Sequence, residues 1–253
     1  MNKPILSDQL SYCGYCNDCK KIHSLPSEKA ITYCYELMEN LRKHRRIDFE
    51  THEEQANPKL TTNVLYSEQG GQMFGILVCS DANHNEIILR AFSSTHNGVW
   101  NADGWVPHLA NETEFMDIVE KGNLLIHPLT DKLQTLNKGS DEWQVKIHER
   151  KQVSRNVLTQ LFALYNLQNF KKEIRSLSNA FIHKTGIPNG TGDCCAPKLL
   201  NYAAKNNLKP ISIAEFYWGR TSISGERKEG EFYSSCTHKC EPLLGFMLCG
   251  SEN

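Results

Sequence analysis

The chain has 253 residues and a formal net charge of -1. Hydrophobic residues make up 40% of it, which is enough for a buried core. The near-zero charge excludes a general electrostatic attraction to nucleic acid or membranes, so any such surface must be local.

No apolar stretch approaches the roughly 20 residues that a membrane span needs. The first ten residues, MNKPILSDQL, lack the apolar segment of a secretory signal. We therefore expect a cytoplasmic protein without a membrane partner. Its ten cysteines then lie in a reducing compartment, where clustered cysteines more often bind metal or stay as thiols than form disulfides.

Residues 1–60 are predicted to form a cysteine-rich helical segment. In SYCGYCNDCKKIH, Cys13, Cys16 and Cys19 are spaced three apart, and His23 follows. Two overlapping CxxC steps are typical of a zinc knuckle, so the three cysteines are candidate metal ligands.

A helix is predicted from Ser27, a possible N-cap, with apolar residues at helical spacing. It ends in the basic string LRKHRR, which is a candidate RNA-binding patch or, equally, the solvated end of a helix. The basic residues in question are Arg42, Lys43, Arg45 and Arg46.

Residues 61–253 are predicted to form an α/β domain, a sheet flanked by helices. A β-hairpin is expected at Met73–Cys79 with Glu86–Ser93, and a helical insertion, either one long helix or a helical hairpin, at about 141–180. A cysteine-led helix, a buried strand (LKPISIAEFYWG) and a second cysteine-led helix follow. Both helix starts are expected on one side of the sheet.

Cys194, Cys236 and Cys240 lie at or near these helix starts and are candidate zinc ligands. Free N–H groups at a helix start favour the thiolate form. Three thiolates plus water, or plus a fourth protein ligand such as His238 or Cys195, satisfy tetrahedral zinc. The alternative is that these thiols only pack, which is the role predicted for Cys195.

The string GDCCAPKLL, followed later by SSCTHKCEP, resembles the zinc-dependent base deaminases, including the bacterial toxin-type enzymes. The resemblance implies a deaminase-like fold. Ala196 stands where a deaminase has its catalytic glutamate, which predicts a structural, inert zinc. If the chain is instead a zinc hydrolase acting on a base or nucleotide, Asp193 or Glu241 is expected to replace that glutamate.

A longer resemblance rests on GGQMFGILV, LRAFSSTHNGVWNADGWVPHL, GTGDCCAPKLLNYAAKNNLKPISIAEFYWG and FYSSCTHKCEPLLGFML. In this order they are similar to the N-terminal region of a subset of RluA-type RNA pseudouridine synthases. The resemblance implies ribosomal or transfer RNA as a partner, and a synthase catalytic domain in cis or trans.

Synthases of that type use an aspartate in a string like HRLDxxTSG, which is absent here; Asp48 lacks the following Thr-Ser-Gly. No catalytic residue is therefore assigned. We expect an accessory role in RNA engagement or substrate positioning. The alternatives are the zinc hydrolase and a structural zinc module without a substrate.

Overall fold

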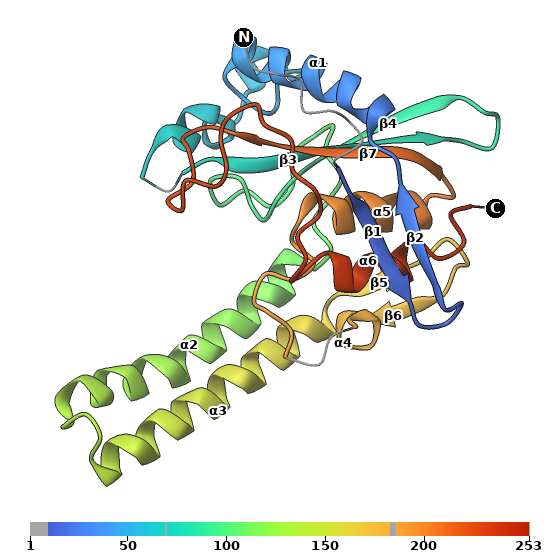
Figure 1. Cartoon of the computed structure of the whole chain (residues 1–253). Coiled ribbons are helices and arrows are strands. Elements are labelled where there is room, and N and C mark those ends of the chain that lie inside the picture. Colours follow the sequence, from blue (N-terminus) through green and yellow to red (C-terminus); the bar gives the residue numbers. More distant parts are fainter. Residues whose placement is uncertain (1–9, 69, 183–185, 253) are drawn as a thin grey trace.

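The computed structural model describes residues 10–68, 70–182 and 186–252 (Figure 1). The expectation about a secretory signal concerns residues 1–10 and so lies almost wholly outside these ranges. Among the described helices, none combines the length and the apolar character that crossing a membrane requires.

A three-stranded antiparallel sheet forms the centre of the molecule, with strand order β4-β3-β7. The strands are β3 (Gln72–Ser80), β4 (Glu86–Phe92) and β7 (Lys209–Trp218). Strand β3 is buried along nearly its whole length, as its continuous apolar run predicts for a strand covered on both faces. The expected hairpin and the expected buried strand are both confirmed.

Helices cover the two faces of this sheet (Figure 1). On one face α1 (Glu28–His44) packs against Phe74, Ile76 and Phe216; on the other, α5 (Cys195–Lys205) packs against Leu77 and Ile213. Because side chains alternate along a strand, each strand contributes to both cores. The predicted α/β class is thus confirmed as a mixed arrangement of helices and small antiparallel sheets.

The first part of the predicted helical segment is a β-hairpin, which corrects the sequence prediction there, whereas the helix predicted after Ser27 is present as α1. Strands β1 (Tyr12–Cys16) and β2 (Lys21–Leu25) pair with each other and pack on α6 (Glu241–Met247). The backbones are in direct contact: a Cβ added to Gly14 would lie 2.3 Å from the nitrogen of Gly245. Only glycine allows this approach.

The insertion is a helical hairpin that projects from the sheets, formed by α2 (Glu112–Thr135) and α3 (Asp141–Ala163) (Figure 1). It begins earlier than predicted, at the N-cap Asn111, whose side chain accepts from the backbone N–H of Glu114. The predicted range also extends too far, since α3 ends at Ala163 and short strands follow at Asn166–Gln168 and Ile174–Ser176.

The shorter elements complete the chain. Strands β5 (Asn166–Gln168) and β6 (Ile174–Ser176) pair, and α4 (Leu177–Ala180) follows them. The turn between the strands is fixed by Asn169, whose side-chain oxygen accepts from two backbone N–H groups. Short 3-10 helices lie at Glu53–Gln55, Pro58–Leu60 and Thr62–Tyr66.

Candidate metal centres

Cys194, Cys236 and Cys240 come together beside the sheet, although 42 residues separate the first two. Cys194 precedes α5, Cys240 precedes α6, and Cys236 lies in the loop between β7 and α6. Their Sγ atoms lie within 4.8 Å of one another, and those of Cys236 and Cys240 are 3.4 Å apart. Tetrahedral zinc, with Zn–S of about 2.3 Å, places sulfur atoms about 3.8 Å apart. These three residues (the cysteine trio) could therefore hold a zinc ion.

The turn from Cys236 to Cys240 explains how three intervening residues are accommodated. The carbonyl oxygen of Cys236 accepts from the backbone N–H groups of Cys240 and Glu241, each at 3.1 Å. This closes the chain into one turn and brings the two thiols to the same side. The CxxxC spacing of Cys236 and Cys240 is one residue longer than the deaminase CxxC, but the two thiols still lie close together.

The three thiols of the trio differ in their tendency to ionise. Contacts with Cys194 and Cys240 lower the pKa of Cys236 strongly, while the same contacts raise the pKa of the other two thiols. The short distances between the three thiols therefore favour ionisation of Cys236 over that of its two neighbours. A metal ion bound here would displace the thiol protons.

The trio faces a cavity of about 300 Å³. Lining residues include the trio, Glu215, Asp193 and the basic residues Arg227, His238 and Lys239. Glu215 comes from β7, the strand between the two cysteine-bearing helices, and is only 4% exposed. Burial raises its pKa to about 7, against the effect of a hydrogen bond from the backbone N–H of Ala196.

Glu215 is held in position from several sides. Its Oε1 lies 2.6 Å from the Ala196 nitrogen, and its own N–H donates to the Tyr12 hydroxyl at 2.7 Å. Opposite it on β3 is Gly75, where an added Cβ would lie 2.7 Å from the Cβ of Cys195. A glycine here leaves room for both the carboxylate and the helix start.

Asp193 lies on the cavity wall, and one of its carboxylate oxygens already has two partners. Its Oδ1 accepts from the Tyr165 hydroxyl at 2.6 Å and lies 3.1 Å from His108 Nε2. His108 Nδ1 accepts from the Ala110 N–H, so Nε2 carries the proton that faces Asp193. Burial opposes ionisation of Asp193, but these hydrogen bonds outweigh it and lower its pKa. Glu241, the other predicted replacement, is exposed on α6.

Cys195 and Lys198 anchor the start of α5. Cys195 is fully buried with its Sγ 3.4 Å from the carbonyl oxygen of Met73, so it packs in the core. Lys198 is also buried and donates to the carbonyl oxygens of Phe92 and Ser94. Burial lowers its pKa to about 8. This lysine joins the end of β4 to the helix that carries the trio's first ligand.

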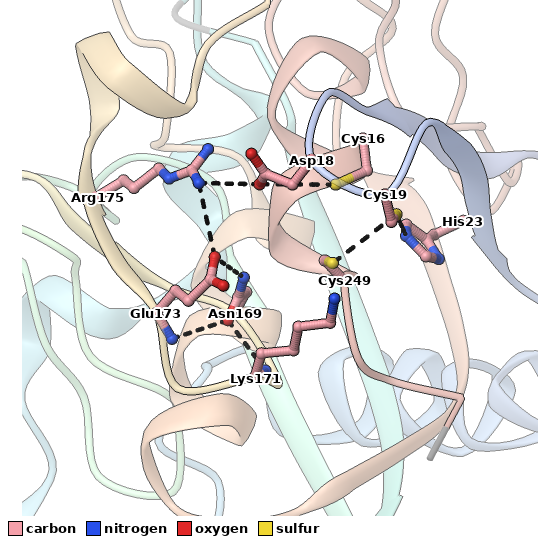
Figure 2. A network of polar contacts seen from close by, with 9 residues as sticks. All are labelled: Cys16, Asp18, Cys19, His23, Asn169, Lys171, Glu173, Arg175 and Cys249. Carbon is pink, nitrogen blue, oxygen red and sulfur yellow. Dashed lines mark hydrogen bonds and ion pairs between the residues drawn. The ribbon is translucent and has the colours of Figure 1, made fainter.

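A second group of donors consists of Cys16, Cys19, His23 and Cys249, whose ligand atoms also lie within 4.8 Å of one another (Figure 2). We call it the second cluster. It too could hold a metal ion such as zinc. Burial opposes ionisation of the Cys19 thiol, but contacts with His23, Cys16 and a backbone N–H lower its pKa to about 7.

Cys13 does not join the second cluster. Its Sγ lies 3.1 Å from Ser11 Oγ. The segment is a strand, so Cys13 and Cys16, three residues apart, point to opposite faces. The CxxC spacing predicts convergence only in a turn, which is where Cys16 and Cys19 lie. Sequence reasoning missed Cys249, which has no spacing motif; its only signal was a cysteine directly after an apolar helix.

The predicted basic residues are divided between two surroundings. Arg42 and Arg45 line a separate cavity of about 450 Å³ together with Tyr66 and Trp218. Arg46 is instead half-buried and ion-paired with Asp48, with Nη2 2.6 Å from Oδ2. Lys43 is exposed on α1, and His238 is exposed at the trio's cavity without belonging to the trio.

No protein-family model matches the chain, and neither the curated proteins nor the solved structures contain a significant match.

Proposed function

We propose that the cysteine trio holds a catalytic zinc ion and that the chain is a zinc-dependent hydrolase of the deaminase type, acting on a base or nucleotide. The observation that carries this is a three-thiol donor set that faces a cavity and shares it with a buried carboxylate. Structural zinc sites use four protein ligands, whereas catalytic sites use three and leave one position for water. The trio offers three protein ligands, the number typical of catalytic sites.

Glu215 supports this proposal because it supplies the group that the local motif lacks. In the deaminases the catalytic glutamate stands at the position of Ala196. Here the carboxylate of Glu215 comes from β7 and is hydrogen-bonded to the backbone N–H of Ala196. A residue distant in sequence thus brings a carboxylate to the start of α5. This nearby carboxylate favours a catalytic zinc over the inert zinc that the sequence predicts.

In the proposed hydrolysis, zinc and the side chain of Glu215 have different tasks. When bound, zinc supplies Lewis-acid activation of a water molecule. Glu215 is placed to take a proton from that water and to deliver it to the leaving amino nitrogen. A carboxylate with a pKa of about 7 can both accept and donate a proton near neutral pH.

The walls of the cavity fit an anionic substrate. Arg227, His238 and Lys239 line it, and Arg227 and His238 are exposed. Basic groups around a site that already holds thiolates favour a ligand bearing phosphate. We therefore place nucleotides and single-stranded nucleic acid ahead of free bases as substrates.

Ammonia release tests the proposal. The zinc-loaded chain is incubated with cytosine and adenine as bases, nucleosides, nucleotides and single-stranded RNA or DNA. We expect zinc-dependent ammonia release from at least one phosphate-bearing substrate, and none from the Cys240→Ser variant. A zinc-loaded trio that converts none of these substrates would contradict the hydrolase assignment.

RNA engagement in an accessory role, with a pseudouridine synthase domain in cis or trans, is the second candidate. The cavity lined by Arg42 and Arg45 favours it, because arginine side chains are common phosphate contacts in nucleic-acid complexes. In this role the chain alone makes no pseudouridine. Nucleoside analysis of labelled ribosomal RNA after incubation with the chain checks this, and robust conversion would exclude a purely accessory function.

A further inference from the structure

The second cluster differs from the cysteine trio in offering four donor atoms. Three of its members, Cys16, His23 and Cys249, are buried. The Sγ atoms of Cys19 and Cys249 are 4.0 Å apart, close to the roughly 3.8 Å of tetrahedral zinc. We infer that the second cluster is a closed Cys3His zinc site with a structural role, independent of the proposed hydrolysis.

The hairpin brings three of the ligands together by local geometry. Cys16 ends β1, and the turn after it closes through a hydrogen bond from the Lys20 N–H to the Cys16 carbonyl oxygen. Lys20 adopts a left-handed φ of 58°, which reverses the chain and returns Cys19 toward Cys16. His23 lies on the inward face of β2. The fourth ligand, Cys249, arrives from the segment after α6.

The imidazole of His23 is oriented as a zinc ligand. Its Nε2 faces the cluster, 2.9 Å from Cys19 Sγ (Figure 2). Its Nδ1 lies 3.4 Å from the Glu252 carboxylate. Histidines that bind zinc commonly donate their other N–H to a carboxylate, which leaves the facing nitrogen free to coordinate. Glu252 therefore selects the tautomer that a metal needs.

The surroundings balance the charge of such a site. Three thiolates and a neutral imidazole around Zn²⁺ leave a net charge of -1 by formal count. Figure 2 shows the ammonium group of Lys171 beside Cys249. Asp18, 3.9 Å from Cys16 Sγ, is neutralised by Arg175 at 2.9 Å. The positive groups offset the charge that the thiolates would leave half-buried.

The position of this site connects it to the cysteine trio. Helix α6 begins directly after Cys240, a trio member, and Cys249 follows its end. The helix also packs on β1, where Gly14 meets Gly245. A zinc ion at the second cluster would fasten the hairpin to the end of α6 and so fix the helix that carries Cys240.

Zinc content per chain tests the inference on the full chain, reconstituted with zinc and freed of excess metal. We expect about two zinc ions in the wild type, one in Cys249→Ser and two in Cys13→Ser, the matched control from the same CxxC string. Equal zinc in the Cys249→Ser and Cys13→Ser proteins would overturn the four-residue site. One ion in the wild type and none in Cys249→Ser would leave this site standing and remove zinc from the trio.

A milder variant decides the matter if Cys249→Ser does not fold. Glu252 is largely exposed, so Glu252→Gln is expected to fold normally. Competition with a chelator should show one zinc ion held about tenfold more weakly, since a carboxylate behind a ligating histidine contributes about that much or more. Unchanged affinity for every bound zinc would contradict His23 as a ligand.

Discussion

The carboxylate of Glu215 accepts a hydrogen bond from the backbone N–H of Ala196, with 2.6 Å between oxygen and nitrogen. The two residues are brought together because β7 runs behind the start of α5, opposite the small residue Gly75. A carboxylate thus lies beside Ala196, the position at which the deaminase-like motif of this chain lacks its glutamate.

We expect Glu215→Gln to abolish hydrolysis and to keep both zinc ions. The amide has the same shape and retains an oxygen that accepts from Ala196, but it cannot carry a proton. Loss of general acid–base catalysis costs about 100- to 10,000-fold in rate. Ammonia release and zinc content are measured side by side, and near wild-type activity in this variant would exclude Glu215 as the proton carrier.

The raised pKa of Glu215 should make the folding stability of the protein depend on pH. The folded-state pKa of Glu215 is raised from 4.5 to about 7, so the folded state binds more protons than the unfolded state between these values. Stability contributed by the protonated acid is present below pH 4.5 and is lost as pH rises through about 7. In a Cys194→Ser background, the melting temperature gained by Glu215→Gln should therefore be larger at pH 8 than at pH 5. A gain of equal size at both would contradict the raised pKa.

Adjacent cysteines at the start of α5 should behave differently. Cys194→Ser removes a ligand and should lose the trio's zinc. Cys195→Ala should keep it and lose about 1 kcal/mol of unfolding free energy, because it leaves a small void in the core. Metal analysis with denaturant unfolding checks both variants. Zinc loss in Cys195→Ala would mean that the wrong thiol has been assigned.

RNA binding, if present, should depend on Arg42 and Arg45 more than on their neighbours. Both line one cavity, whereas Lys43 lies elsewhere on α1 and Arg46 is committed to Asp48. The Arg42→Ala/Arg45→Ala double variant should weaken binding and reduce the slope of log affinity against log salt by about one to two. Lys43→Ala is the control. RNA affinity unchanged in the double variant would exclude this cavity as the RNA-binding site.

The sequence by itself determined the elements whose signals are local. The apolar run of β3, its turn and β4 are visible as a hairpin, and α1 is visible from the helical spacing of its apolar residues; Ser27 stands at the N-cap position but its side chain makes no capping hydrogen bond. The cysteines at or near two predicted helix starts indicated the trio's members. These predictions need only the chain's own periodicity and capping.

Only the tertiary structure decided which donors meet. The second cluster contains Cys249 instead of the predicted Cys13. Side chains alternate along β1, so Cys13 points away from Cys16, and the chain after α6 brings Cys249 to the cluster. In the proposed hydrolase Glu215 has the role considered for Asp193 or Glu241, because one Asp193 oxygen already accepts from Tyr165 and Glu241 is exposed. Spacing along the chain fixes neighbours within a turn. Contacts between distant segments depend on how closely their backbones pack, as at Gly14 and Gly75. The local sequence pattern does not show which segments will pack in this way.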